Sequence, residues 1–274
     1  MAKIKELYSY PVKGCAGMAL GTALMTAAGL AYDRAFMVVD AEGTFRSQRR
    51  DPRLALIRPE IDAGGELLTL RGPDAAGAVD VPVVVDDERR DLRLFGKPFT
   101  GIDQGEDAAA WLTALLGAPS RLVGVPPDHA RVTDGETPGT CGYADSGALH
   151  LTTTASLDHL NERITAAGRA PVPMARFRPN VVAAGPGLEE PHAEDRLRRL
   201  TVGAAELAYA KPAIRCAVTL VDQESGDRAG PEPLRTLATY RRHPGGGVAF
   251  GVKFSVPRGG KLSVGDELTV TARA

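Results

Sequence analysis

The residues best suited to chemistry are Arg215 and Cys216, within the stretch KPAIRCAVTLVD. A cysteine thiolate is both a nucleophile and a soft metal ligand, and a neighbouring guanidinium favours the deprotonated sulfur. The pattern therefore indicates either attack on a substrate by Cys216 or coordination of a transition metal by its sulfur. The alternative is a small buried hydrophobic residue, since the apolar run 217–221 predicts a buried strand that Cys216 would precede.

Basic residues stand at the ends of several predicted strands. These cations are Lys13, Arg34, Arg176, Arg178 and Arg215. Because a closed or nearly closed sheet brings strand ends together, we expect them to surround the thiol of Cys216. A cluster of this kind suits an anionic cofactor. The alternative for each cation taken singly is a solvated surface charge.

Several common catalytic signatures are absent from the sequence. It contains no G-x-G-x-x-G, no G-x-S-x-G and no H-E-x-x-H, and neither of its Gly-Lys pairs continues into a nucleotide-binding loop. The cysteines are odd in number and lack C-x-x-C spacing, which argues against a disulfide framework, a zinc ribbon and an iron–sulfur site. The histidines stand alone and are predicted to be structural or on the surface: His129, His150, His159, His192 and His243.

Composition and charge narrow the class of protein. The chain has 274 residues, with 33 Lys and Arg against 34 Asp and Glu, so its net charge of -1 offers no general attraction to nucleic acid. The first residues lack the apolar core of a secretory signal, and no 18-residue apolar run occurs. We therefore expect a cytoplasmic protein without a membrane segment.

The first half of the chain has the pattern of a β-rich domain. Strands are predicted at 4–10, 54–58, 67–70, 81–85, 92–95 and 121–125, with a hairpin in 29–49 and a helix at 105–116. The following stretch, 126–147, is polar and rich in Gly, Pro and Thr, as in a disordered linker or a functional loop. We place a domain boundary here, which divides the chain into 1–125 and 126–274.

The second half is also rich in strands. The pattern predicts strands at 149–152, 180–184, 217–221, 248–255 and 267–271, a hairpin at 200–209, and helices at 155–167 and 233–241. This ratio of strands to helices favours a β-barrel or sandwich over a doubly wound parallel sheet.

Several strings, spread over residues 5–271, resemble the MOSC family (molybdenum cofactor sulfurase C-terminal domain) in a fixed order. They are YPVKG, GLAYDRAFMVVD, FRSQR, LTTTASLDHLNER, RFRPNVV, IRCAVTLVD and VGDELTV. The resemblance implies a β-rich α+β fold, in which a MOSC β-barrel with short helices follows an N-terminal β-barrel-like domain. The two-part architecture is similar to that of amidoxime-reducing and hydroxylaminopurine-resistance proteins.

The same resemblance implies roles for individual residues. Cys216 matches the thiolate ligand of molybdenum in the molybdopterin cofactor, and Asp145 matches an acid beside the metal that orients a water or supplies a proton. The implied cofactor contacts are Lys13, Gly14, Arg34, Ser146, Arg178, Asn180, Arg215 and Lys253. Two positions depart from the family pattern, since Gly14 stands where relatives often have Ser and Lys253 where they often have Asn or Tyr.

The activity implied by the resemblance is a molybdenum-dependent oxidoreductase. It would reduce small N-hydroxylated compounds, such as hydroxylamines, amidoximes and N-hydroxylated bases, by two-electron cleavage of the N–O bond. A separate electron-donor redox protein is expected, because the sequence carries no flavin or haem signature. The alternatives are a non-catalytic molybdopterin carrier or sulfur relay that uses a Cys216 persulfide, and a β-rich interaction domain with a buried Cys216.

Overall fold

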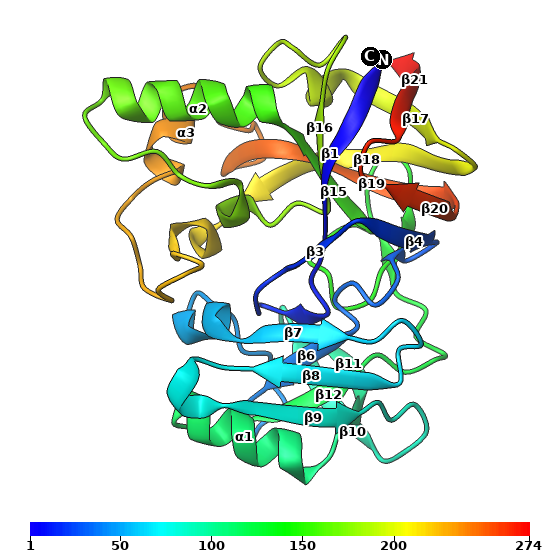
Figure 1. The fold of residues 1–274 in the computed structure, drawn as a ribbon, viewed down its shortest axis with the longest axis vertical. Helices are drawn as coiled ribbons and strands as arrows, with labels where there is room; N and C mark the ends of the chain where they lie inside the picture. Colours follow the sequence, from blue (N-terminus) through cyan, green and yellow to red (C-terminus); the bar gives the residue numbers. More distant parts are fainter.

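A closed barrel forms the upper part of the molecule in Figure 1. The computed structural model describes the backbone of residues 1–274 and every side chain except that of residue 74. Around the barrel the strands follow in the order β16 (Val181–Ala184), β15 (Leu149–Thr153), β19 (Val248–Arg258), β18 (Ala205–Arg215), β17 (Leu197–Val202), β21 (Glu267–Arg273) and β1 (Ala2–Ser9). Pairing of β1 with β16 closes the circle, so no sheet edge stays open there.

The first strands of the chain belong to this C-terminal barrel. β1 lies between β16 and β21, and the two chain ends meet at the top of Figure 1. β3 (Met18–Leu20) pairs with β1, while β4 (Thr22–Thr26) pairs with β20 (Gly260–Ser263) and with β5 (Gly29–Leu30). The two halves of the chain are therefore interleaved in space, and the sequence division at residue 125 stays a prediction.

The lower part of the molecule contains two smaller sheets and a helix. One sheet has the order β10 (Arg89–Leu94), β11 (Lys97–Asp103), β12 (Arg121–Gly124), β6 (Phe36–Val39) and β2 (Val12–Lys13). The other has the order β7 (Arg58–Ile61), β8 (Leu67–Arg71) and β9 (Ala78–Pro82), beside α1 (Glu106–Leu116). Buried Val12, Leu68, Leu112 and Leu122 join these elements in one core.

Two helices lie beside the barrel. α2 (Thr154–Ala166) begins at Thr153, whose hydroxyl accepts a hydrogen bond from the backbone N–H of Ser156 at 3.2 Å. α3 (Leu234–Tyr240) packs against α2 through a cluster that includes Leu160, Leu237 and Phe250. With these helices and the barrel, the predicted β-rich α+β class is confirmed.

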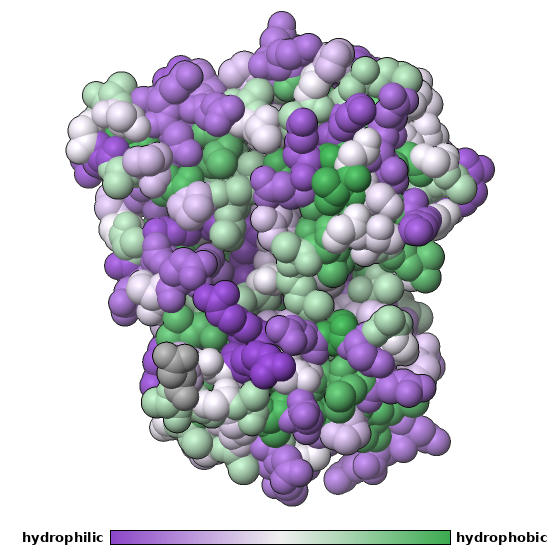
Figure 2. All heavy atoms as spheres, in the orientation of Figure 1, coloured by the Kyte–Doolittle hydropathy of each residue, from purple (hydrophilic) through white to green (hydrophobic). Residues whose placement is uncertain are grey.

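The surface is mixed, and Figure 2 shows strongly hydrophilic side chains gathered near the middle, where the upper and lower parts meet. Within the described residues, no helix is both long and apolar enough to cross a membrane.

Two predicted strands are 3₁₀ helices. Residues 54–58 fall largely in Pro52–Leu56, and residues 217–221 in Ala217–Leu220. A short apolar run does not distinguish a strand from a buried helical turn, so periodicity alone gave the wrong element. Consequently Cys216 follows the long strand β18 instead of preceding a strand, and its side chain stands where the chain turns away from the barrel end.

Candidate functional site

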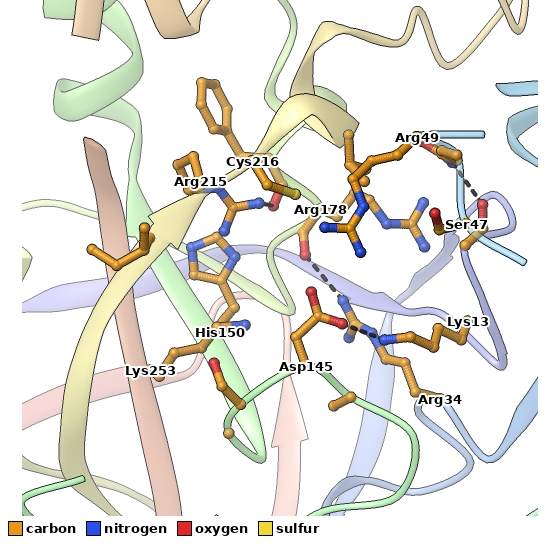
Figure 3. A pocket seen from close by; sticks show the side chains of 18 of the residues that line it. Lys13, Arg34, Ser47, Arg49, Asp145, His150, Arg178, Arg215, Cys216 and Lys253 are labelled. Carbon is orange, nitrogen blue, oxygen red and sulfur yellow. Dashed lines mark hydrogen bonds and ion pairs between the residues drawn. The ribbon is translucent and has the colours of Figure 1, made fainter. Parts of the chain in front are cut away.

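A pocket lies between the barrel and the lower sheets, and Figure 3 shows its polar lining. All of the residues singled out from the sequence as catalytic or cofactor-binding line it: Lys13, Gly14, Arg34, Asp145, Ser146, Arg178, Asn180, Arg215, Cys216 and Lys253. They come from β2, β18, β19 and five loops, so segments remote in sequence deliver them to one place. The sequence-based expectation of their proximity therefore agrees with the geometry.

Arg176 does not belong to the pocket lining, contrary to the sequence prediction. Its guanidinium is buried and donates to the carbonyl of Thr219 at 3.3 Å and to the carboxylate of Asp222 at 3.0 Å. Residues 174–177 form a 3₁₀ turn, whereas alternation in a strand would have placed residues 176 and 178 on the same face. Arg176 thus fixes the turn that carries Arg178.

Cys216 is the accessible thiol of the chain. Cys15 and Cys141 are buried, whereas Cys216 is partly exposed to the pocket. Burial raises the pKa of Cys15 to about 12, which leaves that thiol protonated and inert at neutral pH. The interpretation of Cys216 as a buried hydrophobic residue is therefore not supported by its environment.

Arg215 holds its guanidinium inside the pocket. One nitrogen donates to the carbonyl of Phe177 at 2.8 Å, and the buried Nε has no hydrogen-bond partner among the described residues. Burial lowers the pKa of Arg215, while the sulfur of Cys216 acts in the opposite direction. An unpaired buried N–H of this kind is costly, so the site has unused capacity for an acceptor.

Two arginines contact one aromatic ring. The guanidinium carbons of Arg34 and Arg178 lie 4.2 and 4.3 Å from the ring centroid of Tyr10. Arg34 also donates to the carbonyl of Arg178 at 3.2 Å, and the hydroxyl of Tyr10 donates to the carbonyl of Pro179 at 3.1 Å. Burial is the main cause that lowers the pKa of Arg178 to about 10.

Both arginines also have left-handed backbones, with φ of 51° at Arg34 and 54° at Arg178. Such a conformation costs a residue other than glycine about 1–3 kcal/mol, and it persists where the surroundings impose it. Here both side chains contact the Tyr10 ring, and Arg34 also contacts the carbonyl of Arg178 and pairs with Asp33. One carboxylate thus faces two guanidinium groups, an arrangement that an anion would stabilise.

Lys13 and Asp145 form an ion pair across the interface between the two parts of the molecule. The Lys13 ammonium also lies 5.5 and 5.0 Å from the ring centroids of Phe45 and Phe95. Burial lowers the pKa of Lys13, and the carboxylate of Asp145 partly offsets this effect. Loss of water alone would raise the pKa of Asp145, but Lys13, Lys253 and Arg34 hold it well below its usual range.

The Asp145 loop is held by Arg131, which sequence reasoning did not single out. The Arg131 guanidinium donates to the carbonyls of Gly142 at 3.0 Å, of Ala144 and of Asp145 at 2.8 Å. The polar stretch 126–147 therefore contains a loop whose backbone is fixed by one side chain, and it contributes Asp145 and Ser146 to the pocket.

We expect Asp145→Asn to destabilise the protein at neutral pH, because it leaves the buried Lys13 without a counter-charge. The folded-state pKa of Asp145 is depressed, so its contribution to stability is complete above the unfolded value near 3.9 and is lost as the pH falls below it. Thermal unfolding of both proteins between pH 7 and pH 2 measures this. A melting-temperature difference that stayed constant to pH 2 would contradict it.

Asn180 lies in the pocket wall with its amide already engaged. Its Nδ2 donates to the carbonyl of Tyr8 at 3.1 Å and to Asp33 at 3.0 Å, and its Oδ1 accepts from the backbone N–H of His150 at 3.0 Å. Asn180 therefore joins β1, β15 and the Asp33–Arg34 turn. Its predicted direct contact with a cofactor stays a prediction.

The sequence matches two known domain families. Residues 1–119 match the MOSC N-terminal beta barrel domain, and residues 138–269 match the MOSC domain. The chain belongs to the MOSC family. It is 32% identical to mitochondrial amidoxime-reducing component 1 of Mus musculus, over 96% of this chain and 80% of that protein. The human protein of the same name is also 32% identical, over 96% and 81%.

A further relative has a different name and a greater length. Molybdenum cofactor sulfurase of Danio rerio is 32% identical over 91% of this chain, which matches 31% of that protein. The alignment with the amidoxime-reducing components therefore spans nearly all of this chain and most of theirs, whereas the chain corresponds to about a third of the sulfurase.

The MOSC pocket also contains residues that sequence reasoning missed. Ser47 and Arg49 line it from the FRSQR string, which served in the sequence comparison but was given no role. His150 was predicted to be structural or on the surface; it is buried, lines the pocket, and has its Nε2 3.2 Å from the carbonyl oxygen of Phe250. Burial lowers the pKa of His150 well below its usual value, so the ring is neutral.

A pair of glutamines connects the two parts of the MOSC chain at the pocket. The amides of Gln48 and Gln223 bond each other reciprocally at 3.2 and 3.0 Å. Gln48 also donates to the carbonyl of Gly14 at 2.6 Å, and Gln223 accepts from Arg178 at 3.3 Å. The position of Arg178 is thus tied to the segment that carries Lys13 and Gly14.

Proposed function

We propose that this MOSC protein binds the molybdenum cofactor in the pocket and reduces N-hydroxylated compounds there. One observation carries the proposal: the partly exposed Cys216 lies in a pocket with Arg34, Arg178, Arg215 and Lys253. A soft sulfur ligand beside several cations suits a group that combines a transition metal with anionic oxygens. The amidoxime-reducing relatives support the reaction class.

The lining fits this cofactor on structural grounds. The unpaired Nε of Arg215 provides a hydrogen-bond donor that the described residues leave unused, and Arg34 and Arg178 add positive charge that is only partly balanced, by the ion pair of Arg34 with Asp33. Cys216 would ligate the metal, while Lys13, Arg34 and Arg178 would hold the phosphate. Gly14, Ser146 and Asn180 would complete the wall around the cofactor.

When bound, the cofactor supplies two-electron redox chemistry at molybdenum. The net reaction converts R–NH–OH, two electrons and two protons into R–NH₂ and water. The depressed pKa of Asp145 keeps its carboxylate ionised at neutral pH, so this residue accepts hydrogen bonds and orients a substrate or a water. An ionised carboxylate has no proton to give, so Asp145 is not the proton donor in this proposal.

The electrons come, in this proposal, from a separate redox protein, since R–NH–OH reduction needs two electrons that the chain does not itself provide. The substrate is a small molecule, and the near-neutral net charge of -1 gives no reason to invoke nucleic acid. A cytoplasmic location is part of the same proposal.

The test uses protein produced in a host that makes molybdopterin. Molybdenum near one per chain, together with pterin fluorescence and reduction of a hydroxylamine or an amidoxime by an artificial electron donor, would support the proposal. Full metal and pterin without reduction of any N-hydroxylated compound would overturn the reductase assignment. That result would favour the carrier or sulfur-relay alternative, which a persulfide on Cys216, detected by mass spectrometry, would identify.

Cofactor retention provides a separate prediction for the cationic side of the pocket. We expect Lys13→Ala and Arg34→Ala to lower the molybdenum and pterin retained per chain by roughly tenfold, because each charged hydrogen bond contributes about 1.5–3 kcal/mol. Elemental analysis after gel filtration measures this. The control is Lys261→Ala, since Lys261 is exposed on β20 away from the pocket. Unchanged occupancy in both pocket variants would remove these residues from the site.

A further inference from the structure

We propose that Lys253 is the proton donor to the oxygen that leaves nitrogen, an inference that rests on the proposed function and adds a catalytic residue to it. Lys253 lies in β19 and lines the pocket with its side chain half-buried. Figure 3 places Lys253, His150 and Arg215 on one side of the pocket and Lys13 and Arg34 on the other, with Asp145 between them.

The backbone at Gly147 packs closely against the aliphatic part of the Lys253 side chain and restricts where that side chain can lie. A Cβ added at Gly147 would lie 3.1 Å from the Cβ and 3.4 Å from the Cδ of Lys253, so the lysine stem runs across the bare backbone of the Asp145 loop. Among the described residues, no carboxylate lies within ion-pair distance of the Lys253 ammonium. The Lys253 ammonium therefore lies in the pocket without a paired carboxylate among the described residues.

The other groups in the pocket are poor proton donors. Asp145 is ion-paired with Lys13, which keeps the carboxylate ionised and engages the ammonium of Lys13 with that carboxylate. His150 is buried and neutral, and its Nε2 faces a backbone carbonyl. Arginines do not release protons in proteins. Lys253 is the pocket lysine without an ion-pair partner among the described residues, so its ammonium is free to give a proton to a bound substrate and to recover one from solvent.

The electrostatic surroundings of Lys253 favour this exchange. From β18 it faces Arg215 and the backbone partner Lys211, which is itself paired with Asp134; from β15 it faces His150. The Asp145 loop and the turn bearing Asp33 and Arg34 complete its surroundings. Burial, and then the charges of Arg215 and Arg34, lower the pKa of Lys253 to about 7, outweighing the two carboxylates. A lysine with this pKa suits acid catalysis near neutral pH.

The proposed step balances as follows. Lys253 transfers one proton to the hydroxyl oxygen of R–NH–OH as the N–O bond breaks, and the oxygen leaves as water. Two electrons arrive from the redox protein and reduce the nitrogen, a second proton from solvent completes the amine, and the neutral lysine takes up a proton from solvent. No oxidant or further reactant is required.

The first experiment compares wild type with Lys253→Met and Lys253→Arg after molybdenum and pterin have been quantified. We expect the kcat per bound molybdenum to be about 100-fold lower in both variants, because the methionine side chain has no acidic proton and arginine does not release one. The wild-type rate should fall as the pH rises through a value at or above about 7, since bound anions raise the pKa of Lys253. Both variants should lack this fall in rate with rising pH.

The second experiment needs no activity. Amine acetylation of the apo protein as a function of pH, followed by mass spectrometry, should show Lys253 reacting with a midpoint near pH 7 and the exposed Lys261 near the usual value of about 10.4. Lys261→Met is the matched control for kcat and should behave as wild type. A Lys253 midpoint near that of Lys261 would overturn the inference.

The kinetic outcomes separate this inference from the proposed function. If wild type reduces N-hydroxylated substrates and Lys253→Met does so equally well, or Lys253→Arg restores the full rate, the proton-donor role is wrong and the reductase assignment stands. If wild type with full cofactor reduces no N-hydroxylated compound, the proposed function fails and the role of Lys253 fails with it.

Discussion

Replacing Cys216 by serine is expected to lower the reduction of N-hydroxylated substrates at least about 100-fold, since even groups that merely orient a metal ligand are worth about 10- to 100-fold. A serine hydroxyl stays protonated at neutral pH and is a hard ligand, so it does not replace a soft thiolate. The same variant should lose most of its molybdenum. Elemental analysis, pterin fluorescence and the reductase assay, run on one preparation, measure all three quantities.

The fold should survive this change, because Cys216 is partly exposed and serine has nearly the same shape. Cys15→Ala is the matched control: it removes a thiol that is 0% exposed and packs in the lower core without lining the pocket. It should retain cofactor and activity with a modest loss of stability. A Cys216→Ser protein with full molybdenum and wild-type turnover would show that this sulfur is not the ligand.

The place of Cys216 in a cationic pocket was predictable from the sequence, because a cysteine beside an arginine at a strand end is a candidate for thiol chemistry, and the structure puts its partly exposed thiol in that pocket. An arginine next to a cysteine favours the thiolate form of the sulfur, and this effect does not depend on where the neighbouring strand begins. The local element was nevertheless wrong, since residues 217–220 form a 3₁₀ turn after β18. Selecting Cys216 as a candidate site residue therefore did not require the correct secondary structure, because the residue lies at the end of an element in either case.

The contacts that arrange the pocket cations were not accessible from the sequence. The bond from Arg34 to the carbonyl of Arg178 joins residues 144 positions apart, and both guanidinium groups contact the ring of Tyr10. No local pattern encodes such a contact, because it arises when the closed barrel brings β1 beside β16. The insertion of β1 into the C-terminal barrel was missed for the same reason.

Gly251→Ala is the second change for which we expect a large effect, and it acts on the pocket wall through the backbone. Gly251 lies within β19 at φ +75°, and an added Cβ would be 2.5 Å from Nε2 of His150 and 2.7 Å from the carbonyl oxygen of Leu151. A left-handed backbone costs a residue with a Cβ about 1–2 kcal/mol, and a clash with the neighbouring strand adds to it. We expect a total loss of at least about 3 kcal/mol.

Thermal unfolding of the apo protein measures this loss, and roughly 2–4 °C per kcal/mol is expected for a chain of this size. Gly96→Ala is a closely matched control, because Gly96 has the same φ of +75° and an added Cβ there meets no atom within 4 Å. The difference between the two variants removes the backbone cost and leaves the contact with His150 and Leu151. Equal destabilisation would show that β19 does not press on the pocket wall at this position.

The same pair of variants also connects stability with cofactor binding. His150 lines the pocket and cannot move deeper, because its Nε2 faces the carbonyl of Phe250 and Phe250 stacks on Phe177 with ring centroids 3.8 Å apart. A methyl group at Gly251 must therefore displace His150 or separate β15 from β19. Either shift changes the pocket wall at His150, beside Lys253. The Gly251→Ala protein should therefore retain less molybdenum than wild type at temperatures where it is still folded. The Gly96→Ala protein should retain the wild-type amount.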